Sequence, residues 1–96
     1  MNGVRGEAVA RLAGAERRLC LTLGALAEIE TALGVSGIAD LSERMRTLSA
    51  KDLMAVLAAL LRGGGEIEFA AGLGQAAVDP VEAAEAVVTA FRAAGG

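Results

Sequence analysis

Apolar and polar side chains alternate with a period of two along the first part of the chain. The alternating positions are Ala8, Ala10 and Leu12 on one side and Glu7, Val9 and Arg11 on the other. After Gly14–Glu16, Leu19 and Leu21 again share one side, and Cys20 lies on the other. Two such segments around a short turn that contains Gly indicate a β-hairpin over about residues 6–22. Because an isolated hairpin is marginal in water, we expect the helices that follow to cover its leucine side.

After Thr22 the apolar residues recur every three or four positions, which is the spacing of one face of a helix. The first such stripe consists of Leu23, Leu26, Ile29 and Leu33. It predicts a helix over about residues 23–33 that ends at Gly34. The last such stripe consists of Val81, Ala84, Val88 and Phe91. Asp79 as N-cap and Pro80 in the first turn begin that helix, which we expect over about residues 80–94 with this stripe buried.

Two further helices are predicted in the middle of the chain. The apolar positions of the first, over about residues 38–46, are Ile38, Leu41 and Met45. Ser49 and Asp52 form a capping signal for the second, over about residues 50–62. This second helix is the most apolar segment, so we expect it at the centre of the fold.

The segment that follows is rich in glycine. We interpret Gly63–Gly65 as a helix stop and a flexible loop. Over about residues 66–77, Phe69 and Leu73 are at helical spacing, but two glycines in that stretch each destabilise a helix by about 1 kcal/mol relative to alanine. We therefore expect a short or irregular helix there.

These elements predict an α+β fold that is mostly α, with an N-terminal β-hairpin followed by a small bundle of four to five helices. A chain of 96 residues has room for a single domain, residues 1–96. The core should be thin, because the chain has two Phe and no Trp or Tyr, and each large buried side chain contributes roughly 1.5–3 kcal/mol. We therefore expect modest stability, part of which comes from a partner or a second copy.

The charge of the chain argues against nucleic-acid binding. Phosphate binding depends on clustered Lys and Arg, whereas the formal net charge here is −3 and the basic residues are spread along the chain. Cys20 is the only cysteine, which suits a reducing compartment and a role as a small buried apolar side chain. Met1–Val9 lacks the apolar run of a signal peptide. The longest apolar stretch, Leu53–Leu61, is far shorter than the roughly 20 residues that a bilayer needs, so we expect a cytoplasmic protein with no membrane contact.

No residue pattern in the chain indicates catalysis. There is no histidine, which is the usual general base at neutral pH and the commonest metal ligand. Cys20 has no base beside it, and Glu28 and Glu30 would point to different sides of a helix. No Gly-Lys-Ser/Thr motif follows Gly63–Gly65 to make a phosphate loop. The sequence therefore predicts no enzyme, no catalytic residue, no cofactor, no metal site and no small-molecule substrate.

Protein contact remains as the expected activity. Four apolar residues lie off or beside the main stripes and are predicted to bind a partner: Met45, Leu48, Met54 and Phe69. Met is common on adaptable binding surfaces, and a partner helix can lie in an apolar groove between helices. The same four side chains also suit core positions, and the sequence leaves both interpretations open. The Ala-rich helical faces also suit a close-packed homo-oligomer.

The order of these motifs resembles that of a known family. The hairpin is followed by TLGALAEIETALG at Thr22–Gly34, DLSERM at Asp40–Met45, KDLMAVLAALLRGGG at Lys51–Gly65, and a closing helix after Asp79 and Pro80. This order is similar to that of the tail assembly chaperones of gene transfer agents and prophages, the GTA gp10-like family, over roughly residues 6–94. The chain departs from the family in its Gly72 and Gly74 segment and in its high Ala content.

The resemblance implies a non-enzymatic chaperone or adaptor. Such a protein binds the tape measure protein and the tail tube protein in the bacterial cytoplasm while the tail is built. The resemblance carries over no catalytic or ligand residue. Two alternatives stay open, a structural component of the finished particle and a small helical regulator. The protein composition of purified particles separates the first alternative from the chaperone, and salt-sensitive retention on DNA would indicate the regulator.

Overall fold

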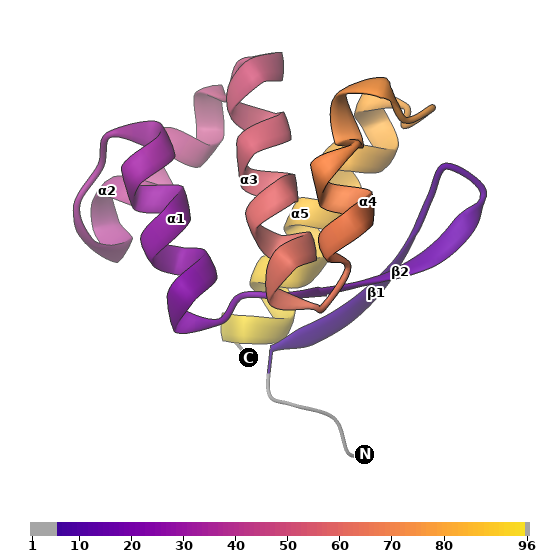
Figure 1. Cartoon of the computed structure of the whole chain (residues 1–96). Helices are drawn as coiled ribbons and strands as arrows, with labels where there is room; N and C mark the ends of the chain where they lie inside the picture. The colour runs from indigo at the N-terminus through magenta and orange to yellow at the C-terminus, as the bar shows by residue number, and fades with distance from the viewer. Residues whose placement is uncertain (1–5, 96) are drawn as a thin grey trace.

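A computed structural model describes residues 6–95, apart from the side chain of Ile38 (Figure 1). In chain order the elements are β1 (Glu7–Leu12), β2 (Ala15–Cys20), α1 (Leu23–Leu33), α2 (Gly37–Arg44), the 3-10 turn η1 (Met45–Thr47), α3 (Ala50–Gly63), α4 (Ile67–Ala71), the 3-10 turn η2 (Leu73–Gln75) and α5 (Pro80–Gly95). The predicted fold class, α+β and mostly α with an N-terminal hairpin, is confirmed. The predictions that fall on residues 1–5, on residue 96 and on the Ile38 side chain lie outside the described residues.

β1 and β2 form an antiparallel pair joined by a two-residue turn. Leu12 pairs with Ala15, so the turn is Ala13-Gly14 and not the predicted Gly14–Glu16. Ala13 has a φ of 54° and Gly14 a φ of 82°. Positive φ at both central residues is the signature of a type I′ turn, whose twist matches that of the two strands. Glycine adopts this conformation freely, whereas the Cβ of Ala13 makes it strained there.

Helices cover the leucine side of the hairpin, as predicted. Leu12 and Leu19 are fully buried, and Leu21 is half-buried against the same core. α5 packs along β1, and α3 packs against β2. Figure 1 shows the hairpin as a twisted ribbon that crosses beneath α3 and α4. The hairpin therefore packs against one side of the helical part of the molecule.

α3 is the central helix, as its composition predicted, and it contacts α1, α4, α5 and β2. Its buried residues are Val56, Leu57, Ala59, Leu60 and Leu61. At its start, the Ser49 hydroxyl accepts a hydrogen bond from the Asp52 backbone N–H at 3.1 Å, which confirms the predicted cap. At its end, Gly65 has a φ of 88°, and the Glu66 N–H donates to the Leu61 carbonyl at 2.8 Å. These are the features of a Schellman C-cap.

Two glycines at the end of α3 allow its backbone to touch β2. A Cβ on Gly63 would overlap the carbonyl oxygen of Cys20, and a Cβ on Gly64 would overlap that of Arg18. The Arg18 N–H in turn donates to a Glu66 carboxylate oxygen at 3.0 Å. The predicted helix stop is confirmed, but the interpretation of this segment as a flexible loop missed its packing role. Glycine is needed here because only a residue without Cβ permits so close an approach.

Two of the predicted helical segments each consist of a short α-helix and a 3-10 turn, and the short or irregular helix expected over about residues 66–77 is confirmed. The segment over about 66–77 consists of α4 and η2, which are separated at Gly72. The helix predicted over about 38–46 is α2 followed by the single turn η1. In both cases a tighter 3-10 turn follows the α-helix, which is a common way for a short helix to end.

The predicted buried stripe of α5 is wrong. Its buried residues are Ala83, Ala86, Val87 and Ala90, whereas Val81 is 65% exposed and Val88 48% exposed. The small alanine side chains let α5 pack closely on β1 and α3, and in this orientation Val87 faces the core while Val81 and Val88 face outward. A similar correction applies at the start of α1, where Leu23 is 84% exposed. Ala25, Ile29 and Leu33 are the buried residues of α1.

Candidate functional site

An apolar groove of about 540 Å³ lies between α5 and the pair α1 and α2. Its lining residues are Leu21, Leu26, Leu41, Ser42, Met45, Val88, Phe91, Arg92, Ala94 and Gly95. We call it the α5 groove. Most of these side chains are aliphatic or aromatic, and Arg92 is the charged residue among them. A groove of this composition suits the apolar side chains of a protein segment, with a polar contact at one side.

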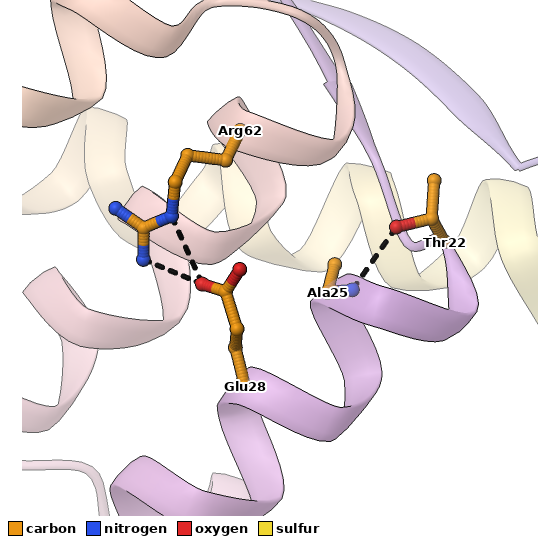
Figure 2. A network of polar contacts seen from close by, with 4 residues as sticks. All are labelled: Thr22, Ala25, Glu28 and Arg62. Atoms are coloured by element: carbon orange, nitrogen blue, oxygen red, sulfur yellow. Dashed lines mark hydrogen bonds and ion pairs between the residues drawn. The ribbon is translucent and has the colours of Figure 1, made fainter.

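Two ion pairs connect α1 and α2, which form one wall of the α5 groove, to the central helix α3. Glu28 of α1 accepts hydrogen bonds from Arg62 of α3, at 2.9 Å from Nε and 2.6 Å from Nη2 (Figure 2). Arg44 at the end of α2 donates to Asp52 of α3 at 2.6 Å. The Glu28–Arg62 pair is exposed, and such pairs contribute about 0.2–1 kcal/mol. These pairs therefore orient α1 and α2 more than they stabilise the fold.

The caps of α1 set the position of the same wall. The Thr22 hydroxyl accepts a hydrogen bond from the Ala25 N–H at 3.0 Å, as Figure 2 shows. Gly34 ends the helix with a φ of 69°, as predicted. Because Leu21 precedes the Thr22 cap directly, the cap also fixes where Leu21 enters the groove.

Two side chains have pKa values that are shifted from their ordinary values. The hydrogen bond from Arg44 lowers the pKa of the Asp52 carboxyl, and the contacts with Ser49 act in the same direction. Burial raises the pKa of the Cys20 thiol, and the nearby Glu7 carboxylate raises it further. A thiol that holds its proton in this way is a poor nucleophile.

A second, smaller groove lies between α3, η2 and the start of α5. It has a volume of about 140 Å³ and is lined by Ala50, Leu53, Met54, Leu57, Leu73, Val78, Pro80 and Ala83. Met54 is 44% exposed at its mouth. This groove has room for little more than one or two side chains.

The four predicted partner-binding residues do not lie on one surface. Met45 lines the α5 groove, and Met54 lines the smaller one. Leu48 is half-buried and packs against the core. Phe69 is also half-buried, with the Arg17 guanidinium carbon 4.0 Å above the centre of its ring. The partner-binding role of these residues stays a prediction, and the structure separates them into two grooves and two core contacts.

The exposed valines of α5 were not among the contact residues predicted from the sequence. Val88 lines the α5 groove and Val81 lies on the same exposed face, seven residues earlier. The signal that could have found them is that α5 carries two apolar stripes, one with Val81 and Val88 and one with Ala83 and Ala90. A helix on the surface of a small domain needs one apolar stripe for the core. The second stripe is therefore available for contact outside the core.

Within residues 6–95, no group of three or more Cys, Asp or Glu side chains is placed to hold a metal ion. None of the helices in that range has the length and apolar character needed to cross a membrane.

Comparison with known proteins assigns the chain to a family. A family model described as "Phage tail tube protein, GTA-gp10" matches residues 5–94. Searches of curated proteins and of solved structures returned no match. The match covers nearly the whole chain and includes every helix and strand of the described part. The chain therefore belongs to the GTA-gp10 family of phage tail tube proteins.

Proposed function

We propose that this protein is a structural component of a phage-like tail, of the kind found in gene transfer agents. The observation that carries the proposal is the family match over residues 5–94, because that family is described as one of tail tube proteins. Such proteins are structural and non-enzymatic, which agrees with the sequence prediction that the chain is not an enzyme. The proposal departs from the chaperone that the sequence resemblance implied, since the family description names a tube protein.

The contact surface in this proposal is the α5 groove with the exposed face of α5. The groove offers apolar side chains from three helices, and Val88 and Arg92 lie at its edge on α5. Apolar anchors surrounded by a few polar groups are typical of protein interfaces. The partners are other tail proteins, including tail tube subunits and the tape measure protein, met in the bacterial cytoplasm during assembly.

The protein composition of purified particles tests this proposal. The chain should be present in intact tails at a fixed ratio to the other tail subunits, measured by quantitative mass spectrometry against isotope-labelled peptides. Particles purified from cells that lack the gene are the control for background. A chain that is abundant in the producing cells but absent from the particles would contradict the structural role and favour the assembly chaperone.

A further inference from the structure

We propose that the exposed face of α5 pairs with α5 of a second copy of this chain in an antiparallel, two-fold dimer. This inference names a partner for the surface described above, but it does not depend on the tail function. It rests on the residues that the core leaves uncovered, on their spacing and on the charges beside them.

The residues of α5 that the core leaves wholly or partly uncovered follow the spacing of a coiled-coil seam. They are Val81, Ala84, Val88, Phe91 and Gly95, at intervals of three and four over two heptads. Val81, Ala84, Val88 and Gly95 are exposed, and Phe91 is half-buried at the α5 groove. Apolar residues at alternating three and four spacing are what one helix presents to another in a coiled coil. The buried residues of α5, which are Ala83, Ala86, Val87 and Ala90, lie on a different face of the helix, and among the seam residues Phe91 also packs against the core.

Charged residues beside this seam match an antiparallel partner. Glu85 and Arg92 are seven residues apart and exposed, so they occupy equivalent places on the same side of the seam. In an antiparallel pair with its two-fold axis near Val88, Glu85 of one copy faces Arg92 of the other. The pair forms twice because the axis relates the two copies. In a parallel pair the two-fold axis runs along the seam, so Glu85 and Arg92 of one copy lie on the opposite side of the seam from those of the other copy, and these ion pairs cannot form.

Small residues allow the two helices to approach. Ala84 and Gly95 lie in the seam on either side of Val88. Glu85 and Arg92 also line a shallow depression on this face of α5, together with Ala84, Val88 and Thr89. A Val88 side chain of the second copy has room to enter between these residues, and the adjoining α5 groove extends the apolar contact. Two heptads are short, so we expect a weak dimer that forms at concentrations on the order of 100 μM.

Sedimentation equilibrium of the purified protein, from about 5 to about 500 μM, is the first measurement. A monomer–dimer equilibrium with no larger species is expected, because a two-fold contact closes on itself. Val88→Asp should weaken the dimer about tenfold or more by placing two carboxylates in the seam. Ile67→Asp, which also charges an exposed aliphatic residue but lies on α4, should leave the dimer unchanged. A monomer at every concentration, or an equal loss in both variants, would overturn the inference.

A charge exchange tests the antiparallel arrangement itself. Glu85→Arg alone and Arg92→Glu alone should each weaken self-association severalfold, because each places like charges across the axis. An equimolar mixture of these two variants should associate again, since the opposite charges then face each other in the mixed dimer. Failure of the mixture to recover association would overturn the antiparallel pairing. If instead the wild-type protein is monomeric but is found in particles, the dimer fails while the proposed tail function stands.

Discussion

Gly64, the C-cap residue of α3, lies directly against the main-chain carbonyl of Arg18 in β2, and there is no space for a side chain between them. Gly63 makes the same kind of contact with Cys20. These contacts attach the end of the central helix to the outer edge of the hairpin, and Glu66 completes the attachment with its hydrogen bond to the Arg18 N–H. The glycines that end α3 thus also determine how closely this helix packs against the hairpin.

Gly64→Ala should therefore destabilise the protein strongly. The new methyl group must displace backbone and not a flexible side chain, so we expect a loss of about 2–4 kcal/mol in the free energy of unfolding. Urea denaturation followed by circular dichroism measures it. Gly24→Ala in α1 is the matched control, because a Cβ there meets nothing closer than the Thr22 hydroxyl at 3.9 Å. The control should be neutral or stabilising by up to about 1 kcal/mol, and equal effects of the two substitutions would contradict the close contact.

Ala13→Gly should stabilise the protein. Ala13 has a positive φ in the type I′ turn, and glycine removes the clash of its Cβ, which costs about 1 kcal/mol. Ala13→Asn should act in the same direction, since Asn-Gly is a favoured pair in this turn. Ala27→Gly, at an exposed position within α1, should instead lower stability by about 1 kcal/mol. The midpoints of thermal unfolding of the three variants would show the opposite signs, and a loss of stability in both Ala13 variants would contradict the assigned turn.

The elements of this fold were predictable because each depends on local rules. The caps at Ser49 and Gly34 and the alternation in the hairpin are encoded by neighbouring residues, and they appear where the sequence predicts them. The orientation of α5 was not predictable, because both of its stripes are apolar. The choice between them depends on how closely α5 can approach β1, which is a property of the tertiary packing.

The candidate site was predicted less well for the same kind of reason. Met45 and Met54 are both solvent-accessible, but the path of the chain through η1 and the start of α3 places them in separate grooves. Phe69 was a plausible contact residue on the basis of its residue type alone. Its contact with Arg17 could not be foreseen, because it joins β2 to α4 across about fifty residues of sequence.

The Arg17–Phe69 contact should contribute to stability as a coupled pair. Arg17 lies over the ring and also reaches Glu66 at 3.5 Å, and a cation–π contact of this kind contributes about 0.5–1 kcal/mol. A double-mutant cycle with Arg17→Met and Phe69→Leu should show a coupling energy in that range. A cycle that combines Arg62→Met with Phe69→Leu serves as the control and should be additive. Additivity in the first cycle as well would show that Arg17 does not act through the ring.

Acid should weaken the attachment of α2 to α3. The pKa of Asp52 is lowered, mainly by Arg44, so its carboxyl stabilises the fold at pH values above the ordinary Asp pKa of about 4. That contribution is lost as the pH falls through the lowered pKa. The difference in unfolding free energy between wild type and Asp52→Asn should thus shrink as the pH is lowered from 6 towards the denaturing acid range. Arg44→Gln should reduce this pH dependence, and a difference that stays constant with pH would contradict the role of the pair.

The incorporation of Val88→Asp into particles is the measurement that tests most directly whether this protein acts as a tail component through the exposed face of α5. Wild type, Val88→Asp and the Ile67→Asp control are expressed in producing cells, and the copies of the chain per purified tail are counted by mass spectrometry. We predict normal soluble levels for all three, normal incorporation of wild type and Ile67→Asp, and a severalfold loss for Val88→Asp. Equal incorporation of Val88→Asp and wild type would contradict it.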